Sequence, residues 1–205
     1  MTSRIILGTH NKKKCQELQH LLQPLGLQLQ SLAELDEALV VEETADNFLD
    51  NARLKAAEQA RHLSAWTIGE DSGLCVPYLK GAPGVLSARY SDPGANDARN
   101  NEKLLRELAS ASGSQRQGYY VSTIALADPV GEIVIEAEGR CWGRIIREYR
   151  GSGGFGYDPL FELVEYHQTF AELGPTVKAV LSHRARALEK FIRQLKGILP
   201  LSPSA

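Results

Sequence analysis

Short apolar runs alternate with amphipathic helical stretches along the chain, and this alternation limits the fold more than any other feature of the sequence. Arg4–Leu7 is expected to form a short buried strand, followed by a turn at Gly8–Asn11. A helix is expected from Lys12, because leucines then recur at spacings of three and four, and Gly26 ends it. Leu27–Leu32 is a plausible second strand. The pattern predicts an α/β protein.

The same reasoning assigns the rest of the chain. A long helix with a stripe of small apolar residues is expected at Asp46–Leu63. A strand at Trp66–Ile68 precedes Glu70 and Asp71, which we expect at its C-terminal end, and Leu74–Tyr78 is a candidate extension of it. The remaining predicted elements are a turn at Gly81–Gly84, a helix at Asn96–Leu108 capped by Asn96 or Asp97, a hairpin of Tyr119–Ala127 and Glu132–Trp142, and a final helix starting near Ser182. The sheet is therefore expected to be mixed.

Composition narrows the class of protein. The chain has 205 residues, 43% hydrophobic and 23% charged, with a formal net charge of −2. We expect one globular domain over residues 1–199, with a disordered tail at 200–205. The net charge argues against a nucleic-acid-binding module. Three widely spaced cysteines, a short N-terminal apolar run and no stretch of ~20 apolar residues together predict a cytoplasmic protein.

Two predicted helices begin with clustered cations. Lys12, Lys13 and Lys14 follow Thr9 and Asn11 at the positive end of the first helix, where a bound phosphate would relieve the repulsion. His183, Arg184 and Arg186 crowd the start of the last helix after Ser182, with Lys178 just before it. The alternatives are a solvated lysine run and a surface arginine cluster.

Acidic residues supply a candidate metal site. Glu70 and Asp71 follow the predicted strand, and Glu42 and Glu43 precede the long helix. Magnesium prefers a few carboxylates together with water and substrate phosphate, and one carboxylate could instead polarise an attacking water. The alternative is that Asp71 only stabilises a turn.

The glycine-rich loop Gly151–Gly156 formally matches the dinucleotide motif G-x-G-x-x-G. A helix must start within that motif, whereas Pro159 biases Asp158 away from helical geometry. The loop instead favours close backbone approach to a flat ligand, with Phe155 or Tyr157 stacking on a base. A simple hairpin connection is the alternative.

These segments resemble the inosine triphosphate pyrophosphatase family in order and in sequence from Ile5 to about Leu195. The resemblance is carried by THNKKK at 9–14, EETADNFLDNARLKA at 42–56, EDSGLCVPYLKGAPGVLSARYS at 70–91, GSGGFGYDPLF at 151–161 and VKAVLSHRARAL at 177–188. It implies a long mixed β-sheet with flanking helices, forming two lobes around a central cleft, a homodimer and a requirement for Mg²⁺. This chain departs from the family's common pattern at two positions. It has Glu70 where bacterial members often have aspartate, and His10 where the family often has glycine.

The resemblance also implies residue roles. Asp71 would be the catalytic base and would hold magnesium with Glu42 or Glu43. Substrate would be bound by Thr9, His10, Asn11, Lys12, Lys13, Lys14, Ser72, Phe155, Gly156, Tyr157, Asp158, Lys178, His183 and Arg184.

The function implied is hydrolysis of non-standard purine nucleoside triphosphates (ITP, dITP, XTP) to the monophosphate and pyrophosphate. His183 and Arg184 would donate to the 6-oxo group, and the 6-amino group of ATP would leave such donors unpaired. The main alternative is a nucleotide-binding sensor without turnover. A dinucleotide oxidoreductase rests only on the rejected glycine motif.

Overall fold

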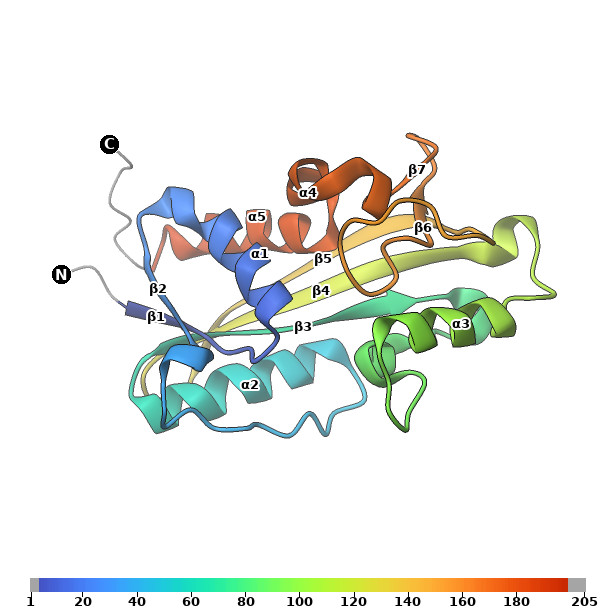
Figure 1. The fold of residues 1–205 in the computed structure, drawn as a ribbon. Coiled ribbons are helices and arrows are strands. Elements are labelled where there is room, and N and C mark those ends of the chain that lie inside the picture. The colour runs from blue at the N-terminus through green and yellow to red at the C-terminus, as the bar shows by residue number, and fades with distance from the viewer. Residues whose placement is uncertain (1–3, 199–205) are drawn as a thin grey trace. The chain divides into compact units, whose positions relative to one another are not determined.

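A computed structural model describes residues 4–198 and shows a mixed β-sheet with flanking helices (Figure 1). The seven strands lie in the order β2-β1-β3-β4-β5-β6-β7. Strand β1 pairs in parallel with β2 and β3, whereas β6 pairs antiparallel with β5 and β7. The prediction of an α/β fold with a mixed sheet is confirmed.

The element bounds follow the sequence pattern in most places. The strands are β1 Arg4–Leu7, β2 Gln28–Ser31, β3 Trp66–Cys75, β4 Gln117–Ala127, β5 Ile133–Ile145, β6 Phe161–Leu163 and β7 Gln168–Thr169. The helices are α1 Lys12–Leu22, α2 Phe48–Leu63, α3 Asp97–Glu107, α4 Phe170–Leu181 and α5 His183–Leu195. The predicted tail at 200–205 lies outside the described residues. Within residues 4–198, no helix is long and apolar enough to cross a membrane.

Strand β3 is the main correction. We expected it to end at Ile68 with Glu70 and Asp71 beyond it, but β3 continues to Cys75 and holds both acids in its interior. Glu70 is 1% exposed and Asp71 is 4% exposed. Carboxylates normally mark the end of a buried strand because burying them is costly. Here neighbouring cations compensate the charge, so the strand continues.

Helix α4 and strands β6 and β7 were not predicted. Gly174, with φ 77°, and Pro175 interrupt the helical pattern within α4. The helix nevertheless begins at a capping box, in which Thr169 and Glu172 satisfy each other's backbone N–H groups. Lys178 therefore lies on α4 and not in a loop before the last helix.

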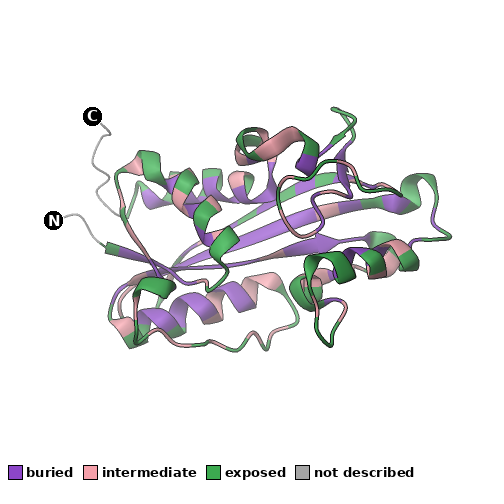
Figure 2. Cartoon of the chain, in the orientation of Figure 1, coloured by how far each residue is buried: buried purple, intermediate pink, exposed green. Residues whose placement is uncertain are grey.

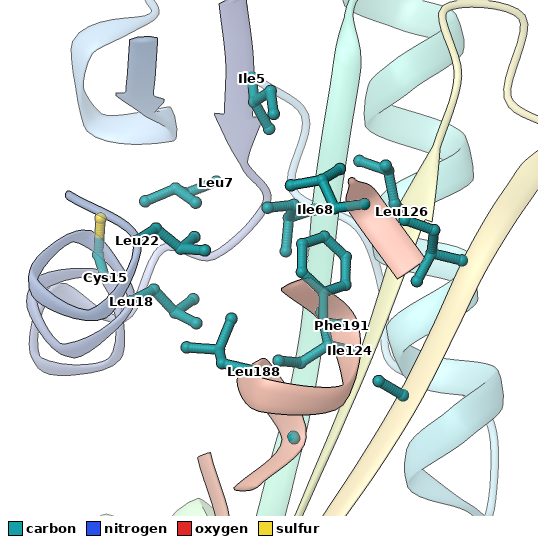
Figure 3. Close-up of a cluster of buried hydrophobic side chains, with 14 residues drawn as sticks. Ile5, Leu7, Cys15, Leu18, Leu22, Ile68, Ile124, Leu126, Leu188 and Phe191 are labelled. Atoms are coloured by element: carbon teal, nitrogen blue, oxygen red, sulfur yellow. The ribbon is translucent and has the colours of Figure 1, made fainter. Parts of the chain in front are cut away.

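The chain divides into two compact units. The described residues of the first unit are 4–71, 122–139 and 184–198, and those of the second are 72–121 and 140–183. The core of the first unit contains Leu18 and Leu22 from α1, Ile68 from β3, and Leu188 and Phe191 from α5 (Figure 3). The leucine pattern predicted for the first helix thus contributes to this core. Buried residues are purple in Figure 2.

The second unit has its own core, built around aromatic rings. Phe161 and Phe170 stack at 5.5 Å between centroids, and Tyr120 packs against Phe161 at 4.7 Å. Leu74 and Leu104 are fully buried in the same cluster. The core of the second unit therefore joins side chains of β3, β4, β6, α3 and α4.

Gly69 allows α2 to approach β3 unusually closely. A Cβ at this position would lie 2.1 Å from Ala52 O and 2.6 Å from Ala56 N. Both are backbone atoms of α2, so neither has a side chain that could move aside. This contact brings the polar face of α2 next to Glu70 and Asp71.

We expect Gly69→Ala to lower the free energy of unfolding by about 3 kcal/mol, because the added methyl group forces two packed backbones apart. Urea denaturation followed by circular dichroism measures this loss. Gly197→Ala is the matched control, since its Cβ would meet Gln194 O at an ordinary 3.4 Å. Equal stability of the two variants would contradict the close approach.

Candidate functional site

The start of α1 is a capped helix terminus that carries three lysines in its first turn. Asn11 caps the helix, its Oδ1 accepting from the backbone N–H groups of Lys13 at 3.0 Å and Lys14 at 3.1 Å. Thr9 Oγ1 accepts from Asn11 N at 3.2 Å, and Gly8 N donates to Ile68 O at 2.7 Å. Helix N-termini of this kind attract anions, as the sequence indicated for this segment.

The Lys14 side chain reaches the two buried acids of β3. Lys12 and Lys13 are exposed, whereas Lys14 Nζ lies 3.3 Å from Glu70 Oε2 and 3.9 Å from Asp71 Oδ1. The lysine run is therefore not simply a solvated face. His10 is exposed, and its Nε2 lies 2.9 Å from Leu39 O.

Lys55 on α2 is a second cation at Asp71. Its Nζ lies 3.3 Å from Asp71 Oδ1 and 2.9 Å from Glu43 Oε1, so one ammonium group joins both carboxylates. Glu42 is exposed and forms no hydrogen bond or ion pair with any residue that the structure describes. This arrangement brings Glu43, rather than Glu42, together with Asp71.

Burial and neighbouring charges together shift the pKa values of Asp71 and Lys55. Burial raises the pKa of Asp71, Lys55 and Lys14 oppose the rise, and Glu43 and Glu70 add to it. Burial alone would lower the pKa of Lys55, but Asp71 and Glu43 outweigh that effect and the pKa is raised. Lys55 thus remains charged, and Asp71 is a more basic carboxylate than an exposed aspartate.

Glu70 is held from other elements. Its Oε1 accepts from Ser122 Oγ at 2.8 Å and from Arg184 Nη2 at 3.1 Å. Arg184 also donates to Glu17 of α1 and is only 1% exposed. The structure therefore places Arg184 in a buried ion network with Glu70, a position that the interpretation as a donor to the base did not anticipate.

A second cluster lies in the second unit, around the glycine-rich loop. Asp158 Oδ2 accepts from Phe155 N at 2.9 Å and from Lys178 Nζ at 2.6 Å. The Lys178 ammonium also lies 4.2 Å from the centroid of the Phe155 ring. Gly154 is required here, because a Cβ would lie 2.1 Å from Asp158 Oδ2 and its φ is +76°.

Helix α3 holds the same loop through Gly156. The Gly156 N–H donates to Asp97 Oδ2 at 2.9 Å, and its carbonyl accepts from Asn101 Nδ2 at 2.9 Å. Tyr157 is 3% exposed and its hydroxyl donates to Ser87 O at 2.8 Å. Of the two aromatic side chains considered for stacking, Phe155 is half-buried and remains the accessible one.

The other predicted residues of this unit occupy distinct places. His183 is 4% exposed and stacks on the Tyr120 ring at 4.7 Å. Ser72 is half-buried on β3, directly after Asp71. The predicted site residues thus form one charged cluster in the first unit and one loop-centred cluster in the second.

Sequence reasoning gave no role in the site to Asn51, Lys55 or Asn101, and it considered Asp97 only as a cap of α3, a place that Asn96 takes instead. A signal existed for Lys55, which interrupts the small apolar stripe of α2 between Ala52 and Ala56. Asp97 and Asn101 are four residues apart and so share a helix face, but nothing in the sequence shows that Gly156 is their partner.

The carboxylates suit a magnesium ion whose remaining ligands come from water and substrate phosphate. Among residues 4–198, no group of three or more His, Cys, Asp and Glu side chains could hold a metal ion. Magnesium, however, usually binds one or two protein carboxylates and takes its other ligands from water and phosphate. Glu43 and Asp71, which share the Lys55 ammonium, fit that requirement.

Fold and site together define an α/β protein with a capped, lysine-rich helix start beside a buried carboxylate–lysine cluster. The chain belongs to the Ham1 family, whose model matches residues 5–194. It is 49% identical to a dITP/XTP pyrophosphatase from Rhodopirellula baltica, over 93% of this chain and 92% of the relative. Identity to the dITP/XTP pyrophosphatase of Thermosynechococcus vestitus is 44%, over 97% of this chain and 98% of the relative.

Solved structures agree with this assignment. A HAM1 protein from Coxiella burnetii superposes with a TM-score of 0.86 at 36% identity, covering 95% of this chain and 99% of that chain. A nucleoside-triphosphatase / dITP/XTP pyrophosphatase from Mycobacterium abscessus gives a TM-score of 0.76 at 40% identity, covering 94% and 99%.

The Arg184–Glu70 pair predicts a stability effect. Arg184→Met removes a buried cation and leaves Glu70 less well compensated, so we expect the free energy of unfolding to fall by about 3–5 kcal/mol. The double variant Arg184→Met/Glu70→Gln should lose less than the single variant, because it removes the buried charge as well. Urea denaturation measures both.

Arg193→Met serves as the control, because the Arg193–Glu189 pair is exposed and should contribute less than about 1 kcal/mol. A loss no larger in Arg184→Met than in Arg193→Met would show that the buried network contributes little to stability.

Proposed function

We propose that this chain hydrolyses non-standard purine nucleoside triphosphates, such as ITP, dITP and XTP, to the monophosphate and pyrophosphate. The observation that carries the proposal is the cluster in which Lys14 and Lys55 converge on Asp71 beside the capped start of α1. Full-length similarity to dITP/XTP pyrophosphatases supports the substrate class.

The triphosphate is assigned to the turn from Thr9 to Lys14. Backbone N–H groups at a capped helix start, together with lysine side chains, complement a polyanion. Lys14 already reaches Glu70 and Asp71, so it can exchange part of that pairing for a phosphate oxygen. This would bring the scissile anhydride to the carboxylate that reacts.

Asp71 and Glu43 are the residues that would hold magnesium. Bound there, the ion would neutralise phosphate charge and polarise the phosphorus–oxygen bond. The carboxylates supply one or two ligands, and Lys55 keeps both of them near the same point. Glu42, the neighbouring acid, stays exposed to solvent.

Asp71 is assigned to accept the proton of the attacking water. Its burial raises its pKa, which makes it a stronger proton acceptor than an exposed aspartate. The anhydride bond between the α and β phosphorus atoms breaks with addition of one water, and pyrophosphate leaves. Lys14 balances the charge that develops on the leaving group. A nucleotide sensor without turnover would not need this arrangement of base and cations.

The loop around Phe155 is assigned to binding the purine base of the substrate. Phe155 offers an accessible ring, and Lys178, whose ammonium lies 4.2 Å from the centroid of that ring, can donate to a 6-oxo group, as can His183 of the same unit. An adenine 6-amino group would leave such donors unpaired, at a cost of about 1–3 kcal/mol for each group. Arg184 is left out of this assignment because Glu70 and Glu17 bind its guanidinium.

The proposal also includes a homodimer and a cytoplasmic location, both implied by the family resemblance. The cysteines Cys15, Cys75 and Cys141 are buried, and no disulfide joins the residues that the structure describes. This is the usual state of cysteine in a reducing compartment.

Asp71→Asn should reduce kcat for ITP by at least about 100-fold, because the amide is neither a base nor a charged metal ligand. Pyrophosphate release measures turnover, and calorimetry should still detect nucleotide binding. Asp36→Asn, an exposed aspartate in a turn, is the control and should be unchanged. Near-normal turnover in Asp71→Asn would refute the assigned role.

Phe155→Leu should raise KM for ITP about tenfold while changing kcat less than threefold, since stacking on a base contributes roughly 1–3 kcal/mol to binding. Tyr149→Leu removes another exposed aromatic ring of the same unit and should leave KM unchanged. If KM responds equally to both changes, or to neither, the base does not stack on Phe155.

A further inference from the structure

Residues 38–45, here called the acidic segment, contain Glu42 and Glu43 but have no regular secondary structure. A candidate metal ligand on an irregular segment needs something else to fix its position, because metal sites depend on ligand placement. The segment runs beside α2 (Figure 1), and polar side chains of that helix form hydrogen bonds with it.

Three buried polar residues on α2 contact the acidic segment. Asn51, Lys55 and Gln59 are 1%, 7% and 1% exposed and lie four residues apart, so they share one face of the helix. Burying two amides and an ammonium is costly unless each finds partners. All three find them in the acidic segment, which shows that this helix face is built to anchor it.

The two amides use the same arrangement. Gln59 accepts from Leu39 N at 3.2 Å and donates to Leu39 O at 2.5 Å. Asn51 accepts from Ala45 N at 3.0 Å and donates to Ala45 O at 3.2 Å. Each amide thus binds both backbone groups of one residue, and Lys55 binds the Glu43 side chain between these two points.

Asn51 differs from Gln59 in one respect. The Nδ2 group of Asn51 also donates to Asp71 Oδ2 at 3.3 Å, while the other oxygen of Asp71 faces Lys55. The Asn51 amide therefore connects the end of the acidic segment directly to the carboxylate on β3. It orients Asp71 and fixes the backbone two residues beyond Glu43 at the same time.

We infer that Asn51 is a positioning residue of the metal site. It sets the spacing and orientation of Glu43 and Asp71 without touching substrate, and Gln59 provides the same backbone anchor without that coupling. This inference rests on the proposed function, since it deepens the assignment of Glu43 and Asp71 to magnesium.

The test compares Asn51→Leu with Gln59→Met, two changes that remove an amide while roughly keeping side-chain volume. Mn²⁺ binding to the nucleotide-free protein is measured by electron paramagnetic resonance of free Mn²⁺. Loss of a group that orients metal ligands typically weakens metal binding 10–100-fold. We expect that loss for Asn51→Leu and less than a twofold change for Gln59→Met.

A second readout separates positioning from general damage. The Mg²⁺ concentration that gives half-maximal ITP hydrolysis should rise at least tenfold in Asn51→Leu and less than twofold in Gln59→Met. Asn51→Ser, a smaller change whose hydroxyl cannot span both groups of Ala45, should show the same pattern if Asn51→Leu does not fold.

Unchanged Mn²⁺ binding in the Asn51 variants would overturn the inference, as would equal weakening in Gln59→Met. A parent protein that binds no Mn²⁺ would overturn it too. Pyrophosphate release from ITP by the parent reports separately on the proposed function, so the two failures are distinguishable.

Discussion

The burial of two adjacent carboxylates inside one strand is the constraint on which the first unit depends. Glu70 and Asp71 lie in the interior of β3, where uncompensated charge would be prohibitive. Compensation comes from three different helices, through Lys14 of α1, Lys55 of α2 and Arg184 of α5. The fold of this unit therefore brings three helices to one pair of acids, and the cations that make the strand possible also make a phosphate site possible.

The two buried acids differ in the side chains that they bind. Glu70 binds Arg184 and Ser122, both at 2% exposure or less, and thereby links β3 to α5 and β4. Lys14 of α1 lies near both acids, whereas Lys55 and Asn51 of α2 bind Asp71. Glu70 therefore links β3 to α5 and β4, whereas Asp71 links it to α2.

Local signals in the sequence predicted much of this, and nonlocal pairing explains the rest. The cationic start of α1 is a short-range feature that the sequence showed, and the structure adds Asn11 as its cap. The end of β3 was predicted wrongly because Lys55 and Arg184, which neutralise its acids, are distant in sequence. Helix α4 was missed because Gly174 and Pro175 break its pattern. The Asn51 contact was beyond prediction because its partner Ala45 contributes only backbone groups.

The two clusters are held by different forces. In the first unit, ion pairs fix side chains whose charges match a metal-bound polyphosphate. In the second, the loop is held through its backbone: Asp158 and Asp97 accept from the N–H groups of Phe155 and Gly156, and Asn101 donates to the Gly156 carbonyl. Backbone anchoring leaves the Phe155 ring as the part of the loop that can meet a flat base. Side-chain charge therefore organises the cluster of the first unit, whereas hydrogen bonds to the backbone organise that of the second.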